Sequence, residues 1–151
     1  MKKGIVIFLI CMWVFICFGC EKKTQKQIAG EDGLVTMDAV LTEDNNITLK
    51  CTIFNKTQKD ITIGEEYYLQ VLKGKSFVDV PLLSEVGGFN LVSIDVLSGD
   101  EYSYRAYIED NYGNLEAGHY RIVKEYTNKD SSNRKEENSD KEIVSAEFDL
   151  P

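Results

Sequence analysis

The sequence of 151 residues contains few side chains whose type and spacing could do chemistry, and the clearest of them is Cys20. The stretch CFGC at positions 17–20 follows an apolar segment and precedes the polar stretch EKK. A bacterial lipobox ends in Gly or Ala followed by Cys, so Gly19 and Cys20 fit this signal, whereas Cys17 and Phe18 depart from it. Cleavage before Cys20 would leave a thiol for a diacylglycerol and an amine for a further acyl chain such as palmitate. Two such chains anchor a protein firmly.

The segment before Cys20 predicts export. Lys2 and Lys3 precede 16 uncharged residues at positions 4–19, which is the pattern of a secretory signal peptide. As a helix these residues would span roughly 24 Å, which is short of the ~30 Å hydrocarbon core. We therefore predict a lipoprotein signal peptide over residues 1–19 and a lipid-anchored protein on the extracytoplasmic face of the cell membrane. The alternatives are an ordinary signal peptide with an incidental cysteine and an uncleaved anchor.

Charge and cysteine content restrict the partners and the chemistry further. Removal of the signal peptide with its two lysines leaves 15 basic against 25 acidic residues, a net charge of −10. Binding to phosphates needs a basic surface, so we expect no nucleic-acid partner. Cys11 and Cys17 would leave with the signal peptide. Cys51 would then be the one thiol besides Cys20, and we expect it to be buried, since it has no partner for an internal disulfide.

No catalytic or metal-binding set is evident in the sequence. His119 is the only histidine, and no motif places a nucleophile beside it, so we interpret it as a surface or half-buried strand residue. One histidine and one buried cysteine do not make a zinc site. The oxygen-rich stretch at positions 110–114 lacks the later acidic residue that a calcium loop requires. We therefore predict no enzymatic activity, no metal and no cofactor.

The elements that must position any functional residue are strands. Apolar residues alternate with polar ones, which predicts one buried and one exposed face for each strand. Clusters of Asn, Asp, Gly and Ser separate these runs, as expected for turns. Pro81 indicates an edge strand, and no helix is expected after Gly33. The pattern predicts an all-β sandwich or barrel, with strands over residues 35–41, 47–53, 61–63, 67–71, 78–82, 92–96, 102–108 and 144–150.

Exposed tyrosines and one polar turn are the candidate contact residues. Alternation turns Tyr68 and Tyr107 outward, where tyrosine adds contact area at a low cost in entropy. Asp110, Asn111 and Tyr112 belong to the turn at positions 110–114. The outward tyrosines form either a ligand-facing patch or cross-strand pairs that shield a sheet face.

One segment has no apolar residue. Residues 127–142 read TNKDSSNRKEENSDKE, between strands that we expect to end at Tyr126 and to start at Ile143. The composition is typical of a solvated hairpin loop. A recognition loop is the alternative, because loops of sandwich domains carry binding.

The stretch EAGHYRI at positions 116–122 resembles the tyrosine corner of immunoglobulin domains, in which Asp-x-Gly-x-Tyr-x-Cys leads into one strand. The resemblance implies that Gly118 and Tyr120 take these places and that the Tyr120 hydroxyl bonds to backbone upstream. It also implies that Cys51 takes the place of the first cysteine of the usual disulfide, with Ile122 in place of the second. An apolar contact would then replace the bridge.

From about Leu34 onward the chain resembles the C-terminal immunoglobulin-like domains of small exported lipoproteins of Gram-positive bacteria. The features that carry the resemblance are an Asn-Lys-Thr turn at 55–57, IGEEYYL at 63–69, LSGD at 97–100, LEAGHYRIV at 115–123 and AEFDL at 146–150. The tryptophan that the family usually carries in the domain is missing, since Trp13 belongs to the signal. The resemblance implies a fold and a location, and it implies no common activity.

These observations predict a signal peptide (1–19), a lipidated Cys20 with a flexible tether (20–33), and an immunoglobulin-like β-sandwich (34–151). We expect a non-enzymatic binding module that the lipid holds at the membrane, with loops at one end of the sandwich meeting an envelope protein or ligand. A protease-inhibitor-like sandwich is the alternative, and a hydrolase is the third class. The sequence names neither the partner nor the oligomeric state.

Overall fold

The computed structural model describes residues 27–30, 33–42, 46–83, 88–90, 92–129 and 141–151. Within these ranges the chain forms ten strands and one short helix. The elements are β1 (Gln27–Ile28), β2 (Val35–Leu41), β3 (Thr48–Asn55), β4 (Ile61–Gly64), β5 (Tyr68–Lys73), β6 (Ser76–Asp79), β7 (Ser93–Val96), β8 (Glu101–Tyr107), α1 (Ile108–Tyr112), β9 (Gly118–Asn128) and β10 (Glu142–Leu150).

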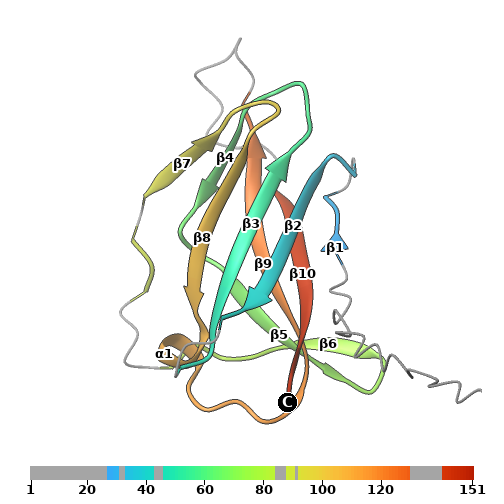
Figure 1. The fold of residues 1–151 in the computed structure, drawn as a ribbon, viewed down its shortest axis with the longest axis vertical. Coiled ribbons are helices and arrows are strands. Elements are labelled where there is room, and N and C mark those ends of the chain that lie inside the picture. The colour runs from blue at the N-terminus through green and yellow to red at the C-terminus, as the bar shows by residue number, and fades with distance from the viewer. Residues whose placement is uncertain (1–26, 31–32, 43–45, 84–87, 91, 130–140) are drawn as a thin grey trace, which may run out of the picture.

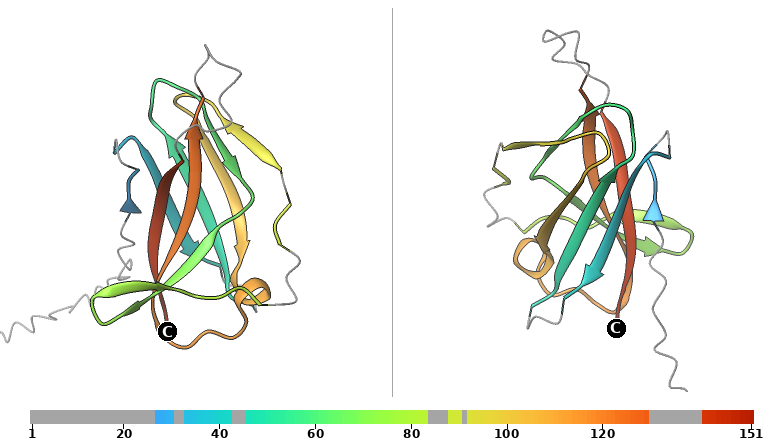
Figure 2. Two further views of the ribbon diagram at one scale, coloured as in Figure 1. Left: turned by 180° about the vertical axis from the view of Figure 1, so that it is seen from behind. Right: turned by 45° about the horizontal axis from the view of Figure 1, so that its top comes forward.

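Two antiparallel sheets face each other (Figure 1). The larger sheet has the order β1-β10-β9-β4-β7, and the smaller one has the order β2-β3-β8. Strands β4 and β5 follow one another along the same edge of β9, since β4 pairs with residues 126–128 and β5 with residues 120–123. Figure 2 shows the hairpin of β5 and β6 projecting from one end of the sandwich.

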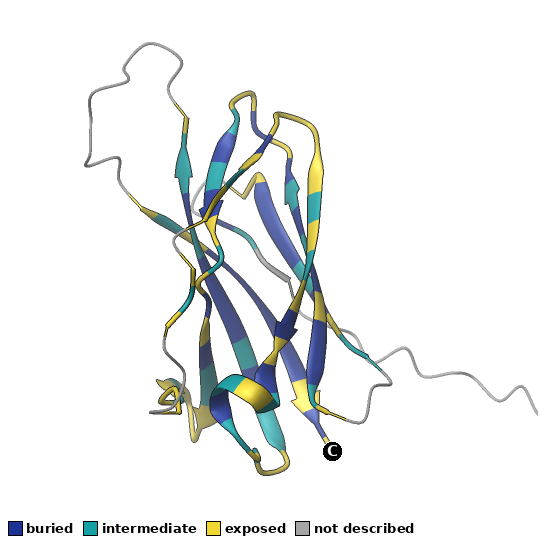
Figure 3. Cartoon of the chain, turned by 90° about the vertical axis from the view of Figure 1, so that its left-hand side faces the viewer, coloured by how far each residue is buried: buried dark blue, intermediate teal, exposed yellow. Residues whose placement is uncertain are grey.

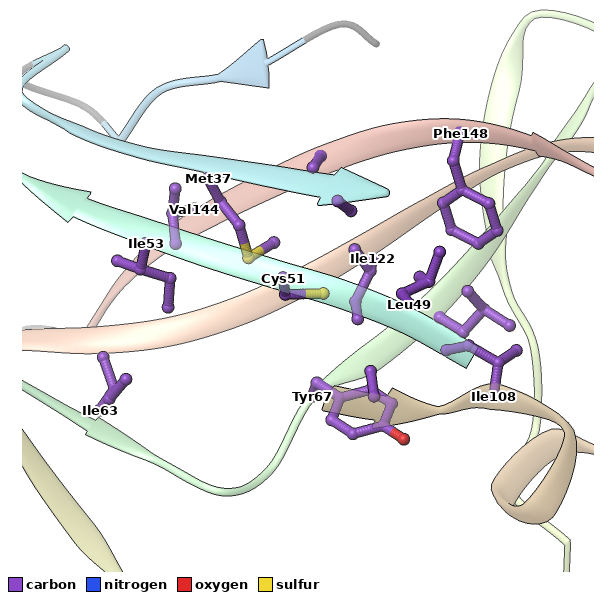
Figure 4. Packing of buried hydrophobic residues seen from close by; sticks show 14 of the residues in the cluster. Met37, Leu49, Cys51, Ile53, Ile63, Tyr67, Ile108, Ile122, Val144 and Phe148 are labelled. Atoms are coloured by element: carbon purple, nitrogen blue, oxygen red, sulfur yellow. The ribbon is translucent and has the colours of Figure 1, made fainter. Parts of the chain in front are cut away.

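The core lies between the sheets because alternate residues of each long strand turn inward. Figure 3 shows the buried positions along the inner faces. In β3, for example, Leu49, Cys51 and Ile53 are fully buried, while Lys50 between them is exposed. Burial of such side chains stabilises the fold by about 1.5–3 kcal/mol each. Figure 4 shows part of this cluster, with Cys51 and Ile122 directed into the same interior.

The helix α1 corrects the expectation that no helix follows Gly33 and that the strand runs on to Ile108. Ile108 and Tyr112 are four residues apart, so one helical turn buries both. The backbone N–H groups of Ile108 and Glu109 both donate to the Ile47 carbonyl oxygen. The Ile47 N–H in turn donates to Glu109 Oε2 over 3.0 Å. These contacts fix a turn of helix where alternation alone predicted strand.

The N-terminal boundary of the domain also differs from the predicted tether over residues 20–33. Gln27 and Ile28 pair with Ala146 and Ser145 of β10, so the folded domain reaches back at least to Gln27. The predicted signal peptide, Cys20 and residues 21–26 lie outside the described residues. Strand β6 ends at Asp79, before Pro81, because proline has no N–H to donate to a ladder. No helix among the described residues is long and apolar enough to cross a membrane.

Candidate functional site: a tyrosine-lined pocket

A pocket of about 260 Å³ opens between the two sheets on the side where β8 ends the smaller sheet. Its walls come from the connection between β4 and β5, from β8, from α1 and from β9. We call it the tyrosine pocket. Its lining residues are Gly64, Glu65, Tyr67, Phe89, Ile94, Tyr102, Tyr104, Arg105, Tyr107, Asn111 and Lys124.

The innermost charged group of the tyrosine pocket is Lys124, which is 2% exposed. Its Nζ donates to the carbonyl oxygens of Glu65 and Glu66, each over 3.1 Å. It also lies 4.5 Å from the centre of the Tyr104 ring, where the face of the ring attracts a cation. Burial lowers the pKa of Lys124 from 10.5 to about 8. The ammonium therefore remains mostly protonated at neutral pH, with its donors directed at these neighbours.

A hydrogen-bonded chain of polar groups links α1 to the mouth of the tyrosine pocket. Asn111 Nδ2 donates to the Tyr67 hydroxyl over 2.6 Å, and that hydroxyl donates to the Tyr107 carbonyl oxygen over 3.3 Å. The Tyr112 hydroxyl donates to the Tyr67 carbonyl oxygen over 3.0 Å. Burial raises the pKa of Tyr112 to about 12, and burial also raises the pKa of Tyr67. Both phenols are therefore neutral at physiological pH. The bonds from Asn111 and Tyr112 hold Tyr67 in place.

The groups in and near the tyrosine pocket differ in the chemistry that they offer. Burial raises the pKa of the Cys51 thiol to about 12, so it forms no thiolate nucleophile at neutral pH. Among the described residues, no group of three or more His, Cys, Asp or Glu side chains could hold a metal ion. The walls carry aromatic faces together with charges of both signs, from Lys124, Arg105 and Glu65. Aromatic walls with a few polar groups are typical of pockets that take a ring or planar group.

At the start of β9 the chain forms a tyrosine corner. The Tyr120 hydroxyl donates to the Glu116 carbonyl oxygen over 2.8 Å, which is the upstream backbone bond that the resemblance to immunoglobulin domains implied. A Cβ atom at Gly118 would lie 3.3 Å from the Tyr120 ring, so glycine lets the ring lie against the backbone. Cys51 on β3 and Ile122 on β9 are both fully buried, and they face the space between the sheets (Figure 4).

The sequence model of the bacterial Ig-like domain family matches residues 33–147. The chain belongs to this family. The prediction of an all-β immunoglobulin-like sandwich is therefore confirmed. A search of curated proteins finds no match to the chain.

The five predicted contact residues do not lie together in the Ig-like domain. Tyr107, which is 50% exposed, and Asn111 both line the tyrosine pocket. Tyr68 is 38% exposed and pairs with Val123 in the larger sheet, and it does not line the pocket. Asp110 is exposed on α1. Tyr112 is 6% exposed, because its ring packs at 6.2 Å from that of Tyr67, so its side chain belongs to the core and not to a contact surface.

The two predicted contact regions lie at opposite ends of the Ig-like domain, which corrects the expectation of contact loops at one end. Helix α1 lies at the end where β9 begins and β10 finishes, and the described ends of the predicted loop, residues 127–129 and 141–142, lie at the other (Figure 1). Strand β9 extends to Asn128 and β10 begins at Glu142, so both strands reach into the predicted loop. Residues 130–140 lie outside the described residues.

His119 lies on the outer face of the Ig-like domain, away from the tyrosine pocket. Its Nδ1 is 2.7 Å from Asp149 Oδ1 and its Nε2 is 3.0 Å from Glu147 Oε2. The hydrogen bond with Asp149 raises the pKa of His119, against a lowering by partial burial, and Glu147 raises it further. Both ring nitrogens are thus held by carboxylates, which fits a half-buried strand residue.

Sequence reasoning missed Lys124, although a signal for it was present. Tyr120, Ile122 and Tyr126 alternate on the inner face of β9, and Lys124 continues the same series. A lysine at an inward position requires hydrogen-bond partners, since burying an unpaired ammonium is very costly. The pattern could have predicted a buried lysine. It could not have named the Glu65 and Glu66 carbonyl groups, which come from another part of the chain.

Proposed function

We propose that the protein is a cell-envelope lipoprotein that displays its Ig-like domain as a non-enzymatic binding module. The observation that carries this proposal is the short distance in sequence between Cys20 and the fold. The lipobox-like Gly19-Cys20 lies only seven residues before β1, which is already part of the larger sheet. A lipid on Cys20 would hold the domain close to the membrane, because six extended residues span at most about 20 Å.

A lipid on Cys20 would lie toward one end of the domain, and the direction of β1 supports this part of the proposal. Strand β1 is antiparallel to β10, and β10 ends at Leu150, opposite Gly118 and near α1. The chain before Gln27 therefore leads toward the α1 end. The loop at residues 56–60 lies at the other end, where Asn55 N–H donates to the Asp100 carbonyl oxygen.

We propose that the module binds its partner through the tyrosine pocket. Tyr107 is exposed at the pocket, and Asn111 is held beside it by Tyr67. The aromatic faces would stack on a neutral ring or planar group of an envelope protein or glycan. Hydroxyl and amide groups at the mouth would orient that group.

Metabolic labelling with an alkyne fatty acid tests the location. We expect label on the wild-type protein in the membrane fraction, and loss of the label together with release from the membrane in Cys20→Ser. Mass spectrometry should give an acylated Cys20 at the N-terminus. An intact Met1, or cleavage at another position, would refute the lipoprotein proposal.

A pull-down from solubilised envelopes tests the binding site separately. Tyr107→Ala removes an exposed pocket tyrosine, and Tyr68→Ala removes an exposed tyrosine outside the pocket as a matched control. We expect the captured partner to fall at least tenfold with Tyr107→Ala and to be unchanged with Tyr68→Ala. Equal capture by the wild type and both variants would show that the tyrosine pocket is not the contact site.

A further inference from the structure

A second cavity, of about 290 Å³, adjoins the tyrosine pocket. The two cavities share three lining residues, Gly64, Glu65 and Phe89, so they are neighbouring parts of one elongated groove. The ring of Phe89 borders both cavities, and its centre lies 4.9 Å from that of the Tyr67 ring. A ligand that fills the tyrosine pocket can therefore extend past Phe89 into the second cavity.

The second cavity differs from the tyrosine pocket in charge. Glu65 and Glu66 line it, and among the described residues no lysine or arginine does. We call it the acidic pocket. The tyrosine pocket, by contrast, is lined by Lys124 and Arg105 as well as by Glu65. The electrostatic potential along the groove therefore becomes more negative from the tyrosine pocket to the acidic pocket.

The two carboxylates of the acidic pocket are not neutralised by the lysines that lie near them. Lys124 and Lys141 both act electrostatically on this pair. However, Lys124 donates its hydrogen bonds to the backbone carbonyl oxygens of Glu65 and Glu66, and Lys141 Nζ lies 2.8 Å from Glu125 Oε2. The ion pairs among the described residues include neither carboxylate of the acidic pocket. A cationic group of a ligand would offset their charge.

We propose that the groove binds a segment of an envelope protein in which an aromatic residue has a lysine or arginine beside it. The aromatic ring lies in the tyrosine pocket, where aromatic faces stack on it. The cation lies in the acidic pocket, beside Glu65 and Glu66, where opposite charges attract. This inference rests on the proposed binding function of the tyrosine pocket, and it adds the chemical class of the partner.

The charges of the groove favour this arrangement over the alternatives. A cation in the tyrosine pocket would lie near Lys124 and Arg105, and a carboxylate in the acidic pocket would lie near Glu65 and Glu66. Like charges repel in both cases. A ring with a basic neighbour is thus preferred over a ring with an acidic neighbour. The net charge of −10 that remains without the predicted signal peptide also attracts a basic partner from a distance.

Small peptides test this assignment on the full-length protein in detergent micelles. The probes are N-acetyl-Tyr-Lys-amide, N-acetyl-Tyr-Gln-amide and N-acetyl-Tyr-Glu-amide, and NMR titration of the peptide signals gives their dissociation constants. We expect the lysine peptide to bind at least tenfold more tightly than the glutamine peptide, and the glutamate peptide to bind more weakly than either. Salt screens exposed ion pairs, so the advantage of the lysine peptide should shrink severalfold between about 0.05 M and about 0.5 M sodium chloride.

Removal of the two carboxylates tests the position of the cation. Glu65→Gln combined with Glu66→Gln keeps the backbone carbonyl groups that bind Lys124, and should reduce the preference for the lysine peptide to less than twofold. Glu101→Gln, at an exposed position of β8 outside both pockets, is the matched control and should leave the preference unchanged. A double variant that keeps the full preference would overturn the inference.

Failure of this inference can be told apart from failure of the proposed function. Equal affinities for the lysine and glutamine peptides, both lowered by Tyr107→Ala, would overturn the inference while the tyrosine pocket remained the binding site. Tighter binding of chitotriose than of the lysine peptide would identify a glycan as the occupant and would also overturn it. Binding of no peptide at all would overturn it too, and the pull-down with Tyr107→Ala would then decide the proposed function by itself.

Discussion

Replacement of the buried lysine by methionine, Lys124→Met, gives the sharpest test of the interior of this domain. The two side chains have similar volume, so packing changes little. Each unit of pKa corresponds to about 1.4 kcal/mol, so the fall in the pKa of Lys124 from 10.5 to about 8 means that keeping the ammonium charged costs about 3 kcal/mol. Methionine removes this cost. It also leaves the carbonyl oxygens of Glu65 and Glu66 without their donor, at about 1–3 kcal/mol each.

Because these two effects oppose each other, the variant at pH 7 should differ from the wild type by no more than about 3 kcal/mol. The pH dependence is decisive instead. The pKa of Lys124 is lower in the folded state than in the unfolded chain, so between pH 8 and 10.5 the unfolded chain binds more protons. The free energy of unfolding therefore rises with pH in that window. Below pH 8 both states are mostly protonated and the effect levels off.

The assay is urea unfolding, followed by circular dichroism, of the chain from residue 21 at pH 7, 8 and 9. From pH 8 to pH 9 the wild type should gain about 1 kcal/mol relative to Lys124→Met. Above pH 9 ionisation of Cys51 in the unfolded chain destabilises the fold, since its pKa is higher when folded. That effect is present in both proteins and cancels in the difference. Lys50→Met, at an exposed position, keeps Lys124, so the wild type should gain no stability relative to this control.

A difference between the wild type and Lys124→Met that stays constant from pH 7 to pH 9 would refute the reasoning. It would mean that the Lys124 ammonium is hydrated in the native state. The tyrosine pocket would then be open to water down to its innermost residue, and the two carbonyl groups would have water as their partner.

Three further predictions concern other parts of the domain. Asn55→Asp replaces an amide that donates to three backbone carbonyl oxygens, and we expect urea unfolding to show a loss of about 3–5 kcal/mol. In Gly30→Ala the new Cβ atom would lie 2.2 Å from the Tyr126 hydroxyl oxygen, so thermal unfolding should reveal a loss of about 1–3 kcal/mol. Gly64→Ala, where the nearest atom is 3.9 Å away, should cost less. The pKa of His119 is raised in the folded state, so its contribution is complete below pH 6.5 and is lost as the pH rises through the folded pKa. His119→Gln should remove this change from a pH series of melting temperatures.

Strands and corner could be predicted from the sequence because their signals are local. Alternation over two to four pairs of residues defines the two faces of each strand. The residues of the tyrosine corner all lie within the seven positions of EAGHYRI. The bond from Tyr120 to Glu116 spans only four residues. Burial of Cys51 was expected because no second cysteine of the domain could pair with it. Such features need no knowledge of which strands become neighbours.

The tyrosine pocket could not be predicted in this way, because its walls come from segments that are distant in the sequence. Tyr67 and Asn111 are 44 residues apart, and Lys124 is 58 residues from Glu66. The pairing of β9 with both β4 and β5 brings Glu66 to Lys124, whereas Asn111 reaches Tyr67 from α1, which follows β8 of the other sheet. Tyr112 was misjudged for the same reason. Its stretch reads as a polar turn, but helix α1 rotates its ring toward Tyr67.

The gap between β4 and β5 along the edge of β9 explains both the buried lysine and the tyrosine pocket. The edge of β9 is shared by β4 and β5, and the chain leaves the ladder between them, at Glu65 and Glu66. Carbonyl groups released from a ladder inside a sandwich need a donor, and Lys124 lies on β9 between the two paired segments, so its ammonium supplies two bonds. The same break parts the sheet beside the exposed edge of β8, where the pocket opens. If β4 continued directly into β5 along β9, no carbonyl groups would need the ammonium of Lys124. The tyrosine pocket would also be closed.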